Sequence, residues 1–88
     1  MTEFLDAQRL ARLNPNSFEV CSELELSVLK KGDLVKVCAN GERFWVQLTK
    51  INWRMLKGTV ANELVLNDLE LGEEVNFHMR NIFDISIV

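Results

Sequence analysis

The feature that most constrains the fold is an Asn40-Gly41 pair placed between two stretches in which apolar and polar residues alternate. Both central residues of a type I′ turn need a positive φ angle, and an Asn-Gly pair meets that need with little strain. Before the pair, Val35, Val37 and Ala39 occupy alternate positions. Because successive side chains of a strand point to opposite faces, these three residues would share one face. The pattern predicts an antiparallel hairpin at the centre of the chain.

Alternation of the same period continues beyond the hairpin and predicts further strands, with a tight turn at Asn52-Trp53-Arg54. The predicted strands that follow the Asn-Gly turn are residues 42–51, 55–62, 75–79 and 82–87. An irregular segment, residues 63–72, interrupts the series, and we expect its leucines to hold it against the core: Leu64, Leu66, Leu69 and Leu71. The inward-facing strand residues form the predicted core: Val35, Val37, Phe44, Val46, Leu48, Leu56, Val60, Val75, Phe77 and Met79.

Two short helices are predicted before the hairpin. The first covers residues 2–13 and ends before Pro15, and its apolar face would contain Phe4, Ala7, Leu10 and Ala11. After a short extended piece at residues 18–20, the second helix begins at a capping box formed by Ser22 and Glu25. Its apolar contacts would pair Leu24 with Val28 and Leu26 with Leu29. The helix ends at Lys30-Lys31, where Gly32 can adopt a left-handed cap.

These elements together predict an α+β domain that is mostly β. The expected architecture is a small antiparallel five-stranded, barrel-like sheet of the SH3-like kind, preceded by two short helices. A chain of 88 residues is expected to form a single domain. Residues 1–32 would then be a helical lead-in, and residues 33–88 the barrel-like sheet.

Composition narrows the class of protein. The formal net charge is -3, so the chain lacks the basic balance that nucleic-acid binders usually have, and we do not expect nucleic acid as a partner. The first residues do not resemble a signal peptide, and no apolar run is long enough for a membrane span. A cytoplasmic location follows as the expectation, in which Cys21 and Cys38 would be free thiols.

No residue pattern indicates catalysis, a cofactor or a bound metal. The chain has one histidine, His78, and its two cysteines are widely separated in sequence. A thiol enzyme that pairs Cys38 with His78, oriented by Glu74 or Asp84, is the catalytic alternative. No sequence motif supports it, so we predict a protein that is not an enzyme.

The aromatic residues supply the candidate binding surface, which comprises Arg43, Trp45, Trp53 and Arg54. Trp and Arg are enriched in binding hot spots. Trp45 faces away from the predicted core, where it either binds a partner or packs under a helix. Trp53 lies in a predicted turn, and turns usually face water. Its alternative position is against the first helix near Phe4 or Leu10, where it would close the core.

Five short motifs follow one another along the chain. They are Gly32-Asp33-Leu34-Val35-Lys36, Gly41-Glu42-Arg43-Phe44-Trp45-Val46, Gly58 to Asn62, Gly72-Glu73-Glu74-Val75-Asn76-Phe77 and Ile82-Phe83-Asp84. In this order, residues 14–85 resemble a family of small bacterial domains of unknown function. The chain departs from the family at Asn52-Trp53-Arg54, where members tend to carry a Gly-Asp-type turn. The resemblance implies a compact, barrel-like β domain and brings no activity, cofactor or catalytic residue.

The sequence therefore predicts a non-catalytic module that binds a protein partner through the Trp45 or Trp53 surface. This expectation rests on analogy with other small β domains. A specialised alternative is an inhibitor or immunity-type protein from a phage or a toxin locus. A further alternative is a weak binder of single-stranded nucleic acid, which would stack bases on the aromatic residues.

Overall fold

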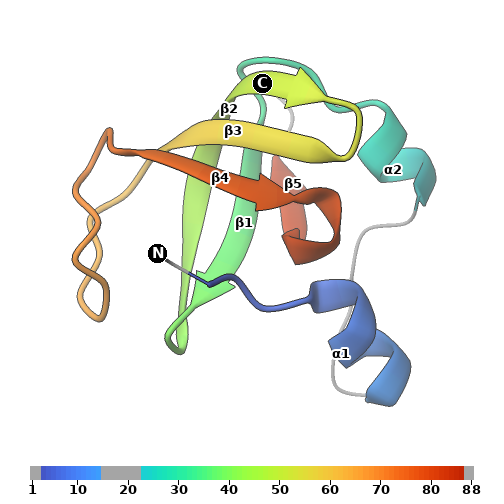
Figure 1. Ribbon diagram of the computed structural model, residues 1–88, viewed down its shortest axis with the longest axis horizontal. Coiled ribbons are helices and arrows are strands. Elements are labelled where there is room, and N and C mark those ends of the chain that lie inside the picture. The colour runs from blue at the N-terminus through green and yellow to red at the C-terminus, as the bar shows by residue number, and fades with distance from the viewer. Residues whose placement is uncertain (1–2, 15–22, 87–88) are drawn as a thin grey trace.

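The computed structural model describes residues 3–14 and 23–86 of the chain. Its strands form one antiparallel sheet in the order β4-β3-β2-β1-β5 (Figure 1). The elements are α1 (Ala7–Leu13), α2 (Glu23–Ser27), β1 (Leu34–Ala39), β2 (Glu42–Asn52), β3 (Met55–Val60), β4 (Glu74–His78), the 3-10 helix η1 (Met79–Asn81) and β5 (Asp84–Ser86). Within the described residues, β4 and β5 are the two edges of a sheet that does not close. The prediction of five antiparallel strands with two short helices is confirmed.

The central hairpin forms as the sequence predicts. Ala39 pairs with Glu42, so that Asn40 and Gly41 are the two turn residues. Their φ angles are 51° and 78°, both in the left-handed region that a type I′ turn requires.

A register shift between Leu48 and Lys50 interrupts the pairing of β2 with β3, and β2 bends strongly along its length (Figure 1). Gly58 lies opposite Leu48 at this bend. A Cβ atom on Gly58 would come within 2.5 Å of the carbonyl oxygen of Gln47 and of Cγ1 of Val46. Glycine is therefore required here by the close approach of two strands, as at other bent or bulged positions.

The main core lies on the concave inner face of the sheet. All the predicted core residues except Met79 are buried. Met79 is partly buried because β4 ends at His78 and Met79 begins η1. The alternation that we extended to Met79 therefore stops one residue earlier, and Ile82, which the sequence did not assign to the core, is fully buried.

The first helix begins later than predicted. It starts at Ala7, and Asp6 caps it by accepting a hydrogen bond of 3.0 Å from the backbone N–H of Arg9. The preceding residues follow β1 instead, because the N–H of Leu5 donates to the carbonyl of Cys38 at 2.9 Å. The ring of Phe4 meanwhile packs among aromatic core residues. A backbone bond and a partly buried ring stabilise this course more than one further turn of exposed helix would.

The second helix is shorter than predicted. It ends at Ser27, and the backbone N–H and the ammonium of Lys30 both donate to the buried carboxylate of Asp33, at 3.0 and 3.1 Å. Gly32 has the predicted positive φ angle, 95°. Leu26 is buried and Leu29 packs on the core, but the predicted Leu24–Val28 contact does not protect these two side chains, which are exposed. The extended piece at residues 18–20 and the Ser22 cap lie outside the described residues.

The segment between β3 and β4 differs from expectation at two of its leucines. Leu64 and Leu69 pack against the core, but Leu66 and Leu71 are exposed. The carboxylate of Glu42 accepts hydrogen bonds from the backbone N–H groups of Val65 and Leu66, at 2.7 and 2.8 Å. These bonds, that of Val65 foremost, hold the pKa of Glu42 below its ordinary value. The loop is thus attached through its backbone, which leaves the side chain of Leu66 directed to water.

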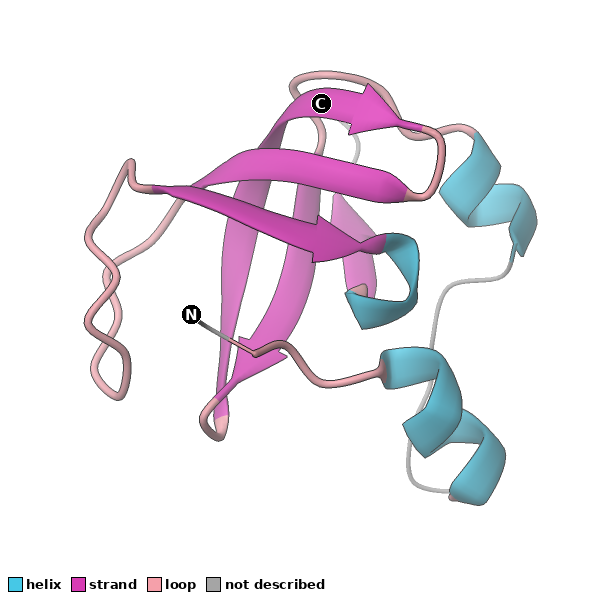
Figure 2. Ribbon diagram, viewed as in Figure 1, coloured by secondary structure: helices cyan, strands magenta, loops and turns pink. Residues whose placement is uncertain are grey.

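The helices gather at one end of the sheet. Figure 2, in which helices are cyan, shows α1, α2 and η1 on the same side, together with the turn between β2 and β3. The long loop between β3 and β4 lies at the opposite end (Figure 1). No helix within residues 3–14 and 23–86 is long and apolar enough to span a lipid bilayer.

Candidate binding groove

The turn between β2 and β3 presents an exposed tryptophan in a strained conformation. Asn52 pairs with Met55, which leaves Trp53 and Arg54 as the two turn residues. Trp53 has a φ angle of 56° and is 80% exposed. A positive φ angle is unusual for a bulky side chain and carries a conformational cost. The predicted turn is confirmed, and the exposure of Trp53 overturns the alternative in which its ring closes the core beside α1.

Two contacts hold this turn in place. The guanidinium carbon of Arg54 lies 5.3 Å from the centroid of the Trp53 ring, which is within the range of a cation–π interaction. The backbone carbonyl of Arg54 also accepts a hydrogen bond of 2.9 Å from the N–H of Met79 in η1. The indole is therefore presented from a turn that is fastened to the neighbouring element.

A hollow with a volume of about 780 Å³ lies beside Trp53. Its walls come from α1, α2, the end of β2, the β2–β3 turn, the end of β4 and η1, and we call it the groove. The floor is apolar and consists of residues that belong to the core or pack on it: Leu26, Leu29, Ile51 and Met79. Because these side chains are held by the core behind them, the floor is formed before any ligand arrives.

The rim of the groove is cationic. Three of the five arginines of the chain line it: Arg12 from α1, Arg54 from the turn and Arg80 from η1. No acidic side chain of the described residues lines the groove. Among the described residues, Asp6 forms an ion pair with this rim, its carboxylate oxygen lying 3.9 Å from Nε of Arg80. Both of these side chains are partly exposed, so this pair screens Arg80 only weakly.

His78 lines the same groove in its neutral form. Its Nδ1 accepts a hydrogen bond of 3.0 Å from the backbone N–H of Arg80, which in the neutral ring places the proton on Nε2. Burial lowers the pKa of His78, the positive charges of Arg80 and Arg54 lower it further, and only Asp6 raises it. Among the described residues, two positive charges and one negative charge therefore act on the imidazole.

The other half of the predicted surface lies elsewhere. Trp45 is partly buried on the outer face of β2, and the ammonium of Lys36 lies 4.9 Å above its ring. Arg43 extends over the ring of Phe83 at 4.8 Å. Both residues pair with β1, whereas Trp53 follows the far end of β2.

The structure therefore brings together Trp53 and Arg54 but not the four candidate residues as one surface. In place of Arg43 and Trp45, it adds Arg12, His78 and Arg80 to the Trp53 turn. The sequence did not single out Arg12 or Arg80, because they are separated from Trp53 by other elements. No local pattern connects a helix, a turn and a 3-10 helix so distant along the chain.

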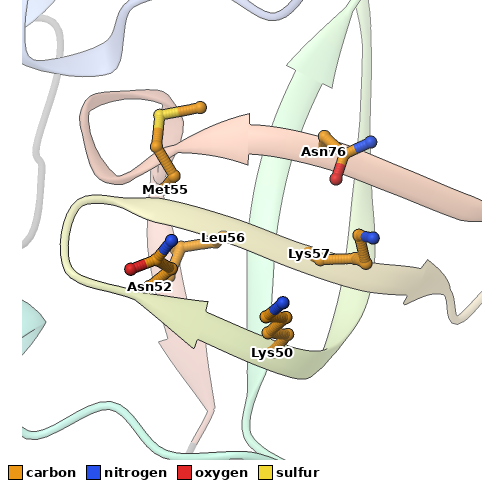
Figure 3. Close-up of a pocket in the computed structure, with 6 residues that line it drawn as sticks. All are labelled: Lys50, Asn52, Met55, Leu56, Lys57 and Asn76. Atoms are coloured by element: carbon orange, nitrogen blue, oxygen red, sulfur yellow. The ribbon is translucent and has the colours of Figure 1, made fainter.

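A second, smaller hollow of about 150 Å³ lies on the outer face of the sheet (Figure 3). The neighbouring positions Lys50, Lys57 and Asn76 of β2, β3 and β4 line it, and Lys57 also pairs with Glu74 at 3.5 Å. Most of its lining side chains are exposed, and most are polar, so we interpret it as a solvated sheet face.

The catalytic alternative stays untested. The buried thiol of Cys38 packs with Ala7 and Phe83, and Nδ1 of His78 accepts from the N–H of Arg80, so none of the described contacts joins the two side chains. In the part of the chain that the structure describes, no group of three or more His, Cys, Asp or Glu side chains is placed to hold a metal ion. Cys21, the other predicted free thiol, lies outside that part.

Comparison of the chain with models of known families, with curated proteins and with solved structures finds no match. The resemblance of residues 14–85 to a family of small bacterial domains stays a prediction. Fold and site together define the class only: a small antiparallel β domain with an arginine-rimmed groove beside an exposed tryptophan.

Proposed function

We propose that this protein is a non-catalytic interaction module that binds a protein partner at the groove beside Trp53. The observation that carries the proposal is the exposed indole held at a positive φ angle. An exposed tryptophan leaves a large apolar area in water, and strained backbone conformations cluster at binding sites, where the strain is part of the function.

The surroundings of Trp53 support a protein ligand. Trp and Arg are the side chains most enriched in binding hot spots, and Trp53 stands beside Arg54 and Arg80. The apolar floor next to them is held by the core, so little side-chain entropy is lost when a partner binds. A preformed apolar hollow with a polar rim is also the usual anatomy of a protein–protein contact.

Affinity capture from the native cell tests this function. We expect Trp53→Ala to lose the partner that the wild-type protein retains, with a melting temperature changed by no more than about 2 °C, because the side chain is exposed. Val65→Ala is the matched control, since Val65 is 89% exposed on the loop at the opposite end of the molecule. The captured partner is then purified and its binding to each variant is measured directly. Retention of that partner by Trp53→Ala would exclude this surface.

The finer architecture and the location belong to the same proposal. A four-strand meander with a bulged, strongly bent β2, whose fifth strand returns to β1, supports a barrel-like, SH3-like arrangement, because bulges and bends let a sheet curl toward closure. The free thiol of Cys38 supports a cytoplasmic location, where thiols stay reduced. An inhibitor or immunity-type role would use the same groove, with a toxin or an enzyme as the captured partner.

A further inference from the structure

We infer that the ligand of the groove is an acidic peptide segment of the partner, with an apolar side chain on the groove floor and carboxylates at the arginines. This inference rests on the proposed protein-binding function and adds the chemistry of the partner. It follows from how charge and apolar surface are distributed over the molecule.

Positive charge is concentrated in the groove, although the chain as a whole carries a net negative charge. The chain has 13 acidic and 10 basic residues, yet the groove collects three of the five arginines and no acidic side chain of the described residues. Within the described part of the chain, neither Arg12 nor Arg54 forms an ion pair. Unpaired guanidinium groups converging on one hollow are complementary to carboxylates, which they can bind in bidentate geometry.

The floor requires an apolar group in the same ligand. Leu26, Leu29 and Ile51 lie beneath the cationic rim, and Trp53 forms one side. A volume of about 780 Å³ is in the range of sites that enclose a compact ligand of several side chains. A small inorganic anion would satisfy the arginines and leave this floor wet. A peptide that carries an aliphatic or aromatic residue between acidic ones satisfies both.

Single-stranded nucleic acid also combines negative charge with stacking groups, but the aromatic residues are poorly placed for it. Proteins of that kind offer successive aromatic side chains along a basic track. Here Trp45 is remote from Trp53 on β2, and the ammonium of Lys36 lies over its ring. A net charge of -3 would also repel a long polyanion outside the groove. The observations therefore favour a short acidic peptide.

Selection from a displayed library of random dodecapeptides tests the chemistry without knowledge of the partner. We expect the peptides that bind the wild-type protein to be enriched in Asp and Glu around one apolar residue, relative to the unselected library. A selected peptide, labelled with fluorescein, is then titrated by fluorescence polarisation at low and high salt. Its affinity should fall as salt is raised, since the arginines are exposed to solvent.

Two variants on one helix form the matched pair. Arg12→Gln and Arg9→Gln both remove an exposed arginine charge from α1, but only Arg12 lines the groove. We expect Arg12→Gln to weaken peptide binding by about threefold to tenfold, the effect of one solvent-exposed charge-assisted contact, and Arg9→Gln to leave it unchanged. Arg54→Gln should weaken binding at least as much, because Arg54 lies against the indole.

The outcomes separate this inference from the proposed function. Acidic enrichment with selective loss in Arg12→Gln supports the inference. If the selected peptides need Trp53 but are not enriched in acidic residues, the proposed protein-binding function stands and the inference of an acidic ligand is wrong. Binding of a fluorescent oligothymidylate that is lost in Trp53→Ala, without any selected peptide, would overturn both. Equal losses in Arg9→Gln and Arg12→Gln would mean a general charge effect and would also overturn the acidic-peptide inference.

Discussion

At the scale of single residues, the backbone conformation of Trp53 beside the groove carries a free-energy penalty. An L-residue with a positive φ angle is less stable than in its ordinary conformations, and glycine avoids this penalty because it has no Cβ atom. Trp53 accepts the penalty while 80% of its surface is exposed, so burial of its ring offsets little of it. The residue at this position is therefore worse for the turn than a glycine would be.

Replacement by glycine tests this reading. We expect Trp53→Gly to leave the free energy of unfolding within about 1 kcal/mol of the wild type, or to raise it, because relief of the strained φ angle offsets the lost contacts. Partner and peptide binding should be lost at the same time. Chemical denaturation and fluorescence polarisation measure the two quantities. A loss of more than about 2 kcal/mol would show that the indole is a structural residue and would count against a binding role.

His78 makes stability depend on pH. Its folded pKa lies below the ordinary value of 6.5, so below that pH the unfolded chain takes up the proton first. The contribution of neutral His78 to the free energy of unfolding is fully present above about pH 6.5. It is lost as the pH falls through the lowered folded pKa. Protonation also removes the acceptor for the N–H of Arg80.

We therefore expect the melting temperature to decline between pH 6.5 and the folded pKa of His78. His78→Asn should flatten that part of the profile, because an Asn side chain can accept the same hydrogen bond without titrating. Thermal melts over a pH range of about 7.5 to 5 measure both profiles, and the imidazole can be followed by NMR. If the wild type and His78→Asn gave the same profile of melting temperature against pH, groups other than His78 would cause the decline in melting temperature.

At the scale of elements, the bend in β2 positions the groove. The strand begins at the central hairpin and ends at the Trp53 turn, and Gly58 allows β3 to follow it closely through the bend. A straight β2 would direct its last residues away from α2 and η1, and the turn would then not reach the N–H of Met79.

Gly58→Ala should destabilise the protein by about 1–3 kcal/mol, since the added Cβ meets backbone and β-branched atoms that cannot move freely. We expect amide chemical shifts to change along β2 and β3 as far as Trp53. Gly41→Ala is the control: a Cβ atom added at Gly41 has nothing within 4 Å, its penalty comes from the positive φ angle alone, and its shift changes should stay in the hairpin. Unchanged amide chemical shifts at the Trp53 turn in Gly58→Ala would mean that the bend does not position the groove.

At the scale of the whole molecule, the groove exists because the two ends of the described chain meet. Asn81 of η1 donates to the carbonyls of Phe4 and Leu5, at 3.3 and 3.0 Å. The ring of Phe4 lies 6.1 Å from that of Phe44 and 5.9 Å from that of Phe77, measured between centroids. These contacts bring α1, with Arg12, to the groove.

Phe4→Ala should lower the free energy of unfolding by about 2–4 kcal/mol, because it removes a ring that packs on the core. Where the protein still folds, we expect faster amide exchange in α1 and weaker peptide binding, as Arg12 loses its fixed position. Phe4→Leu keeps most of the apolar volume and should keep most of the binding. Loss of stability with unchanged exchange in α1 would mean that the helix is held by other contacts.

Much of the sheet could be predicted locally. The Asn40-Gly41 turn, the inward face of each strand and the burial of Phe44 and Phe77 follow from turn chemistry and a period of two, which neighbouring residues determine by themselves. Of the candidate site, the sequence identified the Trp53-Arg54 turn on the same grounds. It did not predict the bend of β2, because that bend depends on a strand that pairs across the sheet.

What the sequence by itself determined is the set of strands, their faces and the place of the turn that carries Trp53, whereas the exposure of that side chain came from the structure. The tertiary structure alone decided that α1 starts at Ala7, that Leu66 faces water, and that Arg12 and Arg80 lie beside Trp53. The reason is the range of the interactions involved. Backbone preferences and side-chain alternation act over a few residues. The packing of Phe4, the hydrogen bonds of the Glu42 carboxylate and the groove depend instead on contacts between residues far apart in the chain.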